Sequence, residues 1–202
     1  DYNYAFDPER SIIFAKEPGD WAVVVDEAHQ LTERGRAYGS PSISASKALA
    51  AATFLTEIEP HRFGPFIQLA KDITDAILDA ARDVEVPLRD GLALVDPSRQ
   101  LWSELSERID DVALDYARVR AAVPTVSPGE LDPWLELARA TLRFCRVLET
   151  MEDETVVLAN LSPGAQRIQL LCLDPSRLLR ERTTSFGGWI GCSATMHPVN
   201  YY

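Results

Sequence analysis

The feature that most constrains the fold is a short apolar run near the start of the chain, Trp21–Val25, which contains three consecutive valines. A turn-forming segment, Pro18–Asp20, precedes the run, and Asp26 and Glu27 follow it. A β-branched run without polar alternation is typical of a strand that is buried on both faces of a parallel sheet. The sequence therefore predicts an α/β fold. Ligands of such sheets bind where the strands end, which here means beside Asp26 and Glu27.

The acidic pair after this strand has the chemistry that nucleotide hydrolysis requires. The segment Val23–His29 reads Val-Val-Val-Asp-Glu-Ala-His, which is the pattern of a Walker B element. We expect Asp26 to bind Mg²⁺, directly or through a water, because this cation takes oxygen ligands. Glu27 would orient and deprotonate the attacking water, and His29 would contact a neighbouring motif or the terminal phosphate. The alternative is the acidic first turn of an ordinary helix, since carboxylates favour helix N-termini.

A second motif, Ser193-Ala194-Thr195, follows an apolar run near the other end of the chain. The motif is similar to the coupling motif of helicases, and this resemblance implies that its hydroxyl groups hydrogen-bond the segment Asp26–His29 and link nucleotide state to DNA binding. Loss of Ser193 or Thr195 should then impair unwinding more than nucleotide binding. The alternative is that the motif only caps the turn after a strand.

These motifs and their flanks resemble the XPD/DinG family of superfamily 2 DNA helicases. The resemblance covers residues 1–36 and 168–202 and includes the flanking segments Tyr2–Pro8, Cys172–Arg177 and Cys192–Met196, with Tyr201 and Tyr202 after them. It implies part of a RecA-like parallel-sheet motor domain that is interrupted by a mainly helical arch domain. The motor domain would comprise residues 1–38 and 166–202, and the arch residues 39–165.

The resemblance also implies an activity for the intact protein. That protein would use ATP and Mg²⁺ to move 5′ to 3′ on single-stranded DNA and to unwind duplexes in repair or replication. The family further implies a Walker A loop and a 4Fe–4S cluster held by four cysteines, both upstream of the matched region and neither present in this sequence. We therefore expect an inactive fragment of a larger enzyme. The Ala- and Arg-rich insert favours the bacterial DinG-like branch.

The charge distribution limits how such a chain can bind DNA. The net charge is −11, and residues 31–170 carry 22 acidic and 15 basic side chains, so the chain lacks the basic surface that is usual in nucleic-acid binding. Arg34, Arg36 and Lys47 are the candidate phosphate contacts, and an ordinary solvated surface is the alternative. A second possible function is a protein-interaction module in which the acidic arch binds a partner. A third is a degenerate ATPase used as a scaffold, which the intact Asp26 and Glu27 oppose.

Within the arch, a high content of Ala and Leu predicts a helix over residues 46–57. Apolar spacing predicts three more helices, over residues 66–84, 97–122 and 132–150. Asp96 should cap the third, with Pro97 at its first position, and Asp132 and Pro133 should open the fourth. The seam of the third helix is predicted to be Leu101, Leu105, Ile109, Val112, Tyr116 and Val119. Core packing is the favoured role for Phe66, Trp102 and Trp134, and base stacking is the alternative.

After residue 150 the spacing of apolar residues changes from a helical pattern to a strand pattern. Strands are predicted over residues 155–160, 167–173 and 189–192, with a short helix at 175–185, and this order indicates a βαβ-like return to a parallel sheet. Cys145, Cys172 and Cys192 are widely spaced and are interpreted as buried free thiols. No apolar stretch is long enough to cross a bilayer and no signal peptide is evident, so a cytoplasmic protein is expected.

Overall fold

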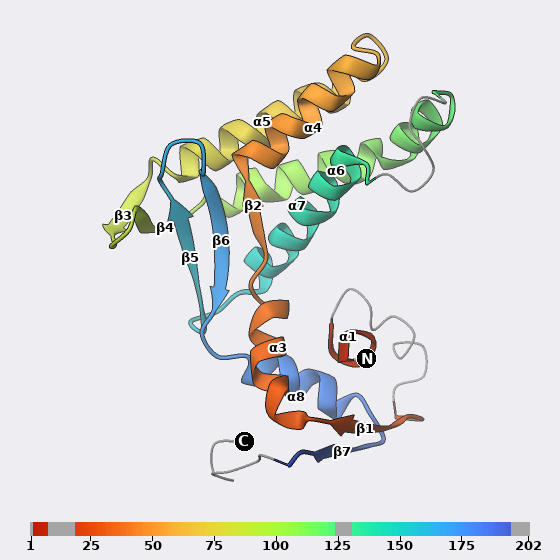
Figure 1. Ribbon diagram of the computed structural model, residues 1–202, viewed down its shortest axis with the longest axis vertical. Coiled ribbons are helices and arrows are strands. Elements are labelled where there is room, and N and C mark those ends of the chain that lie inside the picture. Colours follow the sequence, from red (N-terminus) through yellow and green to blue (C-terminus); the bar gives the residue numbers. More distant parts are fainter. Residues whose placement is uncertain (1, 8–18, 124–130, 195–202) are drawn as a thin grey trace. The chain divides into compact units, whose positions relative to one another are not determined.

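The computed structural model describes residues 2–7, 19–123 and 131–194. It is a mixed α/β structure, 55% helical, with one parallel two-stranded sheet and one antiparallel five-stranded sheet (Figure 1). The chain divides into two compact units, unit 1 (residues 1–40 and 171–202) and unit 2 (residues 41–170). Their boundaries lie within a few residues of those expected from the sequence for the motor domain and the arch. The identity of the units with those domains stays a prediction.

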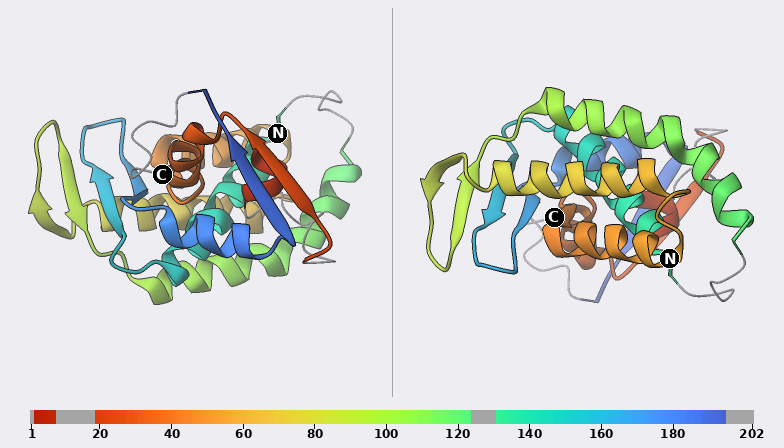
Figure 2. Two further views of the ribbon diagram at one scale, coloured as in Figure 1. Left: turned by 90° about the horizontal axis from the view of Figure 1, so that it is seen from below. Right: turned by 90° about the horizontal axis from the view of Figure 1, so that it is seen from above.

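Unit 1 is built around two parallel strands that are far apart in the sequence. β1 (Ala22–Asp26) pairs with β7 (Gly188–Cys192) in continuous register (Figure 2, left). Its helical elements are α1 (Tyr2–Phe6), η1 (Ala28–Gln30), α3 (Leu31–Tyr38) and α8 (Ser176–Thr184). A small core joins these helices to the strands, and it includes Phe6, Val25, Leu31, Tyr38 and Phe186.

The prediction that β1 is buried on both faces is wrong. Val25 is 4% exposed, whereas Val24 on the opposite face is 72% exposed, and its cross-strand neighbour Ile190 is 63% exposed. Successive side chains of a strand point to opposite faces, so one face of the pair packs on the unit 1 core. Among the described residues, nothing buries the other face to a similar degree.

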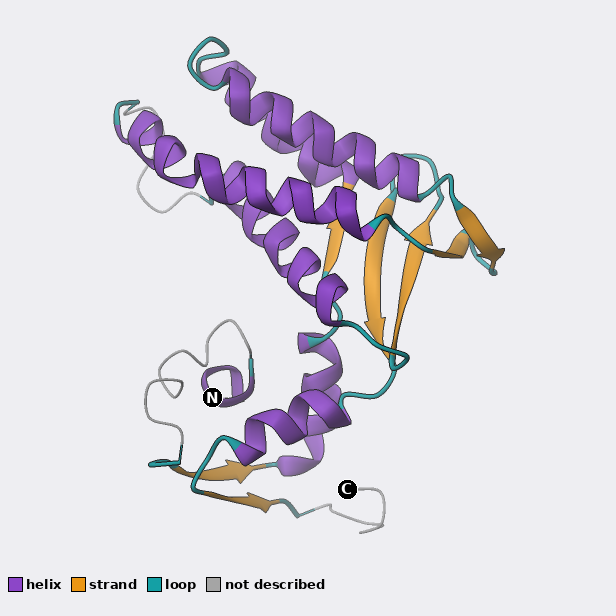
Figure 3. Ribbon diagram, turned by 180° about the vertical axis from the view of Figure 1, so that it is seen from behind, coloured by secondary structure: helices purple, strands orange, loops and turns teal. Residues whose placement is uncertain are grey.

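Unit 2 contains four long helices close to the predicted spans, which Figure 3 shows in purple. They are α4 (Ala45–Ile58), α5 (Gly64–Ala80), α6 (Arg99–Ala121) and α7 (Pro133–Thr150). Asp132 caps α7 as expected, because its carboxylate accepts the N–H groups of Trp134 and Leu135. The predicted cap of α6 is wrong, since the Ser98 hydroxyl accepts the Leu101 N–H and the helix begins after Pro97.

The five-stranded sheet of unit 2 has the strand order β2-β6-β5-β4-β3. Its strands are β2 (Ser42–Ser44), β3 (Val84–Pro87), β4 (Leu92–Val95), β5 (Thr155–Asn160) and β6 (Arg167–Cys172). The predicted extension of α5 to Val84 is wrong, because that residue begins the β3–β4 hairpin. Asp90 and Gly91 both have positive φ in its turn, and Asp-Gly is a strong hairpin signal that could have located it.

The predicted βαβ-like return is also wrong. β6 pairs with β2 in the antiparallel sheet, whereas β7, which follows α8, pairs with β1 in the parallel one. A βαβ unit requires both strands in one sheet. The segment β6–α8–β7 instead connects two different sheets.

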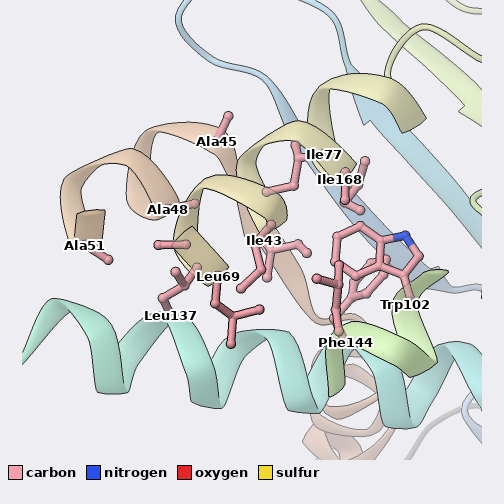
Figure 4. Packing of buried hydrophobic residues seen from close by; sticks show 14 of the residues in the cluster. Ile43, Ala45, Ala48, Ala51, Leu69, Ile77, Trp102, Leu137, Phe144 and Ile168 are labelled. Atoms are coloured by element: carbon pink, nitrogen blue, oxygen red, sulfur yellow. The ribbon is translucent and has the colours of Figure 1, made fainter. Parts of the chain in front are cut away.

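The main core lies between the four helices and the five-stranded sheet (Figure 4). Phe66, Trp102 and Trp134 are each at most 3% exposed, which confirms their packing role. Trp102 packs on Phe144 with ring centroids 5.0 Å apart, an aromatic contact that adds to area burial. In the predicted seam of α6, Leu105, Ile109 and Tyr116 are buried, but Leu101 is exposed and Trp102 takes its place.

The thiol predictions are partly correct. Cys145 and Cys172 are buried free cysteines, whereas Cys192 is exposed. Burial raises the pKa of the Cys145 thiol to about 12, and its Sγ donates to the Trp102 carbonyl oxygen at 3.2 Å. Cys145 is therefore a packing residue. Cys192 is exposed because it lies on the same face of the strand pair as Ile190.

Replacing Thr141 of α7 by valine should raise the free energy of unfolding by about 1 kcal/mol. Thr141 is fully buried in unit 2, and its Oγ1 has no hydrogen-bond partner among the described residues. Valine has the same shape and needs no partner, so the desolvation cost of the hydroxyl disappears. Urea denaturation would measure the change. Thr74→Val is the matched control, because Thr74 Oγ1 donates to the Ala70 carbonyl at 2.9 Å and its loss should give no gain. A lower stability for Thr141→Val would contradict the prediction.

Candidate functional site

The two sequence motifs meet at one edge of the parallel strand pair. Asp26 ends β1 and is in register with Cys192, which ends β7. The carboxyl ends of parallel strands lie at the same edge of their sheet, so Glu27 and Ser193 emerge side by side. Gly191 permits the close approach there, because a Cβ at this position would lie 3.0 Å from the Ala28 Cβ.

The backbone turns sharply at Glu27. This residue has φ 52° and ψ 44°, the left-handed conformation that non-glycine residues rarely adopt. Its N–H donates to Asp26 Oδ1 at 2.9 Å, and its carbonyl accepts the Gln30 N–H at 2.9 Å. The conformation costs on the order of 1–2 kcal/mol. Strained positions of this kind are concentrated at functional sites.

The turn brings together three polar side chains, which we name the Glu27–His29–Ser193 cluster. His29 Nδ1 lies 2.8 Å from Ser193 Oγ and 3.1 Å from Glu27 Oε2, and Ser193 Oγ donates to Glu27 Oε2 at 3.3 Å. The hydrogen bond expected between Ser193 and the segment Asp26–His29 is therefore present. All three groups are hydrogen-bonded when His29 Nδ1 carries the proton. Nδ1–H then donates to Ser193 Oγ, and the Ser193 hydroxyl donates to Glu27 Oε2. Side-chain exposures of 49% for Glu27 and 31% for His29 leave the cluster open to solvent.

The geometry of the cluster excludes one alternative chemistry. A nucleophilic Ser-His-acid triad places the serine and the carboxylate on opposite nitrogens of the imidazole ring. Here both Ser193 and Glu27 contact the same nitrogen, Nδ1. The arrangement suits a carboxylate base whose orientation is set by a serine and a histidine, and it does not suit acyl transfer by Ser193.

The remaining residues of the second motif are placed only in part. Ala194 is exposed just after Ser193, and it contributes no side-chain polar group. Thr195 lies outside the described residues, as do Met196, Tyr201 and Tyr202 of the resemblance. The expected role of the Thr195 hydroxyl stays a prediction.

The donor set at this edge fits Mg²⁺ bound mainly through phosphates. Asp26 is an exposed carboxylate at the end of β1, and Mg²⁺ is commonly held by one or two carboxylates together with phosphates and waters. No group of three or more His, Cys, Asp or Glu side chains that could hold a metal occurs in the described part of the chain. The residues therefore do not form a protein cage for a metal. The isolated Cys145, Cys172 and Cys192 do not fit a 4Fe–4S cluster.

The three candidate DNA-binding residues are exposed but are not grouped together. Arg34 and Arg36 lie on α3 in unit 1, and Lys47 lies in the first turn of α4 in unit 2. Sequence reasoning missed Arg180 and Trp189, which share a pocket of unit 1 with Arg36. The spacing of Arg180 and Thr183, which places both on one face of a helix, was the available signal for the α8 side of this pocket.

Comparison with known proteins assigns no family. The chain matches no family model, and no curated protein matches it at a significant level. Within the ranges 2–7, 19–123 and 131–194, no helix has both the length and the apolar character needed to cross a membrane.

Proposed function

We propose that this chain is a segment of an ATP-dependent DNA helicase of the XPD/DinG type. Unit 1 would be part of its RecA-like first motor domain, and unit 2 would be the arch inserted into that domain. The observation that carries the proposal is the Glu27–His29–Ser193 cluster, in which two motifs 164 residues apart form hydrogen bonds at the end of two parallel strands. A cytoplasmic and bacterial protein is proposed on the same resemblance.

The connections between the units support an inserted domain. β2 begins unit 2 and pairs with β6, which ends it, in the register Ser42↔Gln169. The Leu170 N–H also donates to the Pro41 carbonyl at 3.0 Å. Because the entering and leaving segments of unit 2 lie side by side, its insertion leaves the β1–β7 pairing of unit 1 intact.

Each side chain at the edge of the strand pair has a distinct role in this proposal. Asp26 would hold Mg²⁺, which neutralises charge that develops on the ATP phosphates. Glu27 would orient and deprotonate the attacking water, and His29 would hold the Glu27 carboxylate. Ser193 contacts both residues, so it would transmit nucleotide state to β7 and, with Ala194 and Thr195, to the DNA-binding surface. The Walker A loop and the 4Fe–4S cluster would be supplied elsewhere in the intact enzyme.

Ser193→Ala in the intact helicase should uncouple hydrolysis from movement. We expect strand unwinding to fall at least about tenfold, while ATP affinity changes less than about twofold, because the hydroxyl contacts Glu27 and His29 and the proposal assigns it no phosphate contact. Unwinding of a fluorescent duplex and DNA-stimulated ATP hydrolysis would be measured together. Ser185→Ala is a control in unit 1 outside the cluster, because the Ser185 hydroxyl donates to the Arg182 carbonyl oxygen at 2.7 Å. Equal losses of ATP binding and unwinding would contradict a coupling role.

An acidic surface favours a second candidate function for unit 2. Exposed carboxylates follow the outer faces of α5 and α6, among them Asp75, Glu107, Asp110 and Asp111. Such a surface repels nucleic acid and attracts basic surfaces. The arch could therefore recruit a basic protein partner. Saturable, salt-sensitive binding of a partner by unit 2 in the absence of DNA would support this role over a purely DNA-guiding one.

A further inference from the structure

Unit 1 contains a partly open pocket that does not include Asp26, Glu27, His29 or Ser193. It has a volume of about 380 Å³ and lies between η1 and α3 on one side and α8 and β7 on the other. Its walls are formed by Ala28, Leu31, Thr32, Arg36, Leu173, Asp174, Pro175, Ser176, Leu179, Arg180, Thr183 and Trp189. The volume lies at the small end of the range of about 300–1,000 Å³ that is usual for small-ligand pockets.

The charged groups of the pocket favour an anion. Arg36 and Arg180 line it from two different helices, and among the described residues Asp174 is the only acidic one in its lining. The Asp174 carboxylate accepts the Ser176 hydroxyl at 2.5 Å and the Ser176 N–H at 2.9 Å. These two bonds, with a smaller contribution from Arg36, lower the pKa of Asp174. Among the described residues, no carboxylate lies within ion-pair distance of the Arg180 guanidinium. The pocket therefore has an excess positive charge, centred on Arg180.

The other lining groups favour a planar ring attached to that anion. Trp189 is 44% exposed, although it lies on the helix-covered face of β7. An exposed indole offers a stacking surface for a base, and every base has a face that can use it. Thr32 and Thr183 are half-buried. The Thr183 hydroxyl donates to the Arg180 carbonyl oxygen at 3.1 Å and so offers the pocket an acceptor, whereas the Thr32 hydroxyl can donate or accept.

We propose that this pocket binds one nucleotide unit, with its phosphate held by Arg180 and Arg36 and its base against Trp189. The assignment adds a second nucleotide-binding surface to unit 1, separate from the residues proposed for ATP hydrolysis. Two sources share this chemistry, a free mononucleotide and one residue of a single strand. The strand source depends on the proposed helicase function, whereas binding itself does not.

The test is direct binding of the 202-residue chain, without ATP, to a fluorescein-labelled oligothymidylate and to dTMP as competitor. Trp189→Ala should weaken oligonucleotide binding by at least about fivefold, the low end of the usual effect of removing a stacked aromatic residue. Trp189→Phe should recover most of the affinity. Arg180→Ala should weaken binding and reduce the slope of log affinity against log salt by about 0.7, as expected for one lost phosphate contact on a single strand.

Arg177→Ala is the matched control for charge. Arg177 is an exposed arginine of the same helix, does not line the pocket, and lies 3.7 Å from Glu181. Its loss removes the same formal charge, and binding should change less than about twofold. Urea denaturation of each variant would show whether the fold is retained. If Trp189→Ala unfolds unit 1, the comparison of Arg180→Ala with Arg177→Ala still decides the question.

The competitor identifies the source of the nucleotide. Displacement of the oligonucleotide by dTMP would support a pocket for free mononucleotides, and displacement only by unlabelled oligothymidylate would support a strand site. The proposal would be overturned by equal effects of Arg177→Ala and Arg180→Ala, by inorganic phosphate competing as well as dTMP, or by no binding to either nucleotide probe. Because the assay contains no ATP, these outcomes are independent of whether Glu27 activates water.

Discussion

In the intact helicase that we propose, Glu27→Gln should lower DNA-stimulated ATP turnover by at least about 100-fold, the low end of the usual contribution of a general base. Glutamine keeps the length of the side chain and an oxygen that can accept from Ser193 and His29. It cannot take a proton from the attacking water. ATP affinity should remain within about threefold of the wild-type value, since the proposed contact of Asp26 with Mg²⁺ and the Walker A loop expected elsewhere in the enzyme do not require the Glu27 charge.

The measurement is steady-state ATP hydrolysis with and without single-stranded DNA, together with binding of a fluorescent ATP analogue. Glu33→Gln is the matched control, because Glu33 is an exposed carboxylate of the following helix, α3, in the same unit. Its turnover should equal that of the wild type. Turnover that is indifferent to Glu27→Gln would remove the water-activating role and would favour the scaffold or interaction-module hypotheses.

The second large effect is expected at the junction of α6 and α7, where Asp132→Ala should lower the free energy of unfolding of unit 2 by about 3 kcal/mol. Asp132 Oδ2 accepts the Tyr116 hydroxyl at 2.7 Å and the Arg120 Nε at 3.0 Å, while Oδ1 caps α7. The side chains of Arg120 and Asp132 are 18% and 10% exposed. Alanine would leave a largely buried guanidinium and hydroxyl without their acceptor.

Two further variants separate what the Tyr116 hydroxyl and the helix cap each contribute to the free energy of unfolding. Burial and the nearby Asp132 raise the pKa of Tyr116, so its hydroxyl stays a donor across the ordinary pH range, and Tyr116→Phe should cost only about 1 kcal/mol. Asp132→Asn should retain much of the helix cap, because asparagine is also a good N-cap residue.

Arg118→Ala is the control for an exposed pair. Arg118 lies 3.0 Å from Asp115, with side-chain exposures of 77% and 66%, so its loss should cost at most about 0.5 kcal/mol. Urea denaturation followed by circular dichroism would measure each change. A loss for Asp132→Ala no larger than that for Arg118→Ala would show that the junction contributes little.

Helical periodicity was the most reliable guide to the fold. The predicted spans 46–57 and 132–150 differ from α4 and α7 by one residue at most at each end, because long amphipathic patterns and a strong cap at Asp132 are local signals. The strand at 155–160 was also predicted with its observed bounds. The short strands β2, β3 and β4 were missed, since three or four residues carry too little periodicity to be distinguished from a loop or a helix end.

Errors of burial had a different origin. Val24 and Cys192 are apolar residues in strands, yet both are exposed, because which face of a strand is covered depends on what packs against it. The N-cap of α6 is Ser98 and not the predicted Asp96. Both side chains can accept backbone N–H groups, and the position of the first helical turn decides which of them is the cap.

The candidate site, like the fold, depends partly on local sequence and partly on tertiary packing. The order of residues along the chain determined that Asp26 and Glu27 follow a strand and that Ser193 follows another. The local sequence also determined where the four long helices of unit 2 lie and most of the residues on their buried faces. These are properties of the local sequence, since they depend on residues within one or two turns of each other.

Only the tertiary structure decided which strands are neighbours. A strand's backbone can pair with many partners, and the choice of β7 beside β1, and of β6 beside β2, is made by the burial of side chains from the whole unit. That choice places Ser193 against Glu27 and His29. It also brings Arg36, Arg180 and Trp189, which come from α3, α8 and β7, to one pocket.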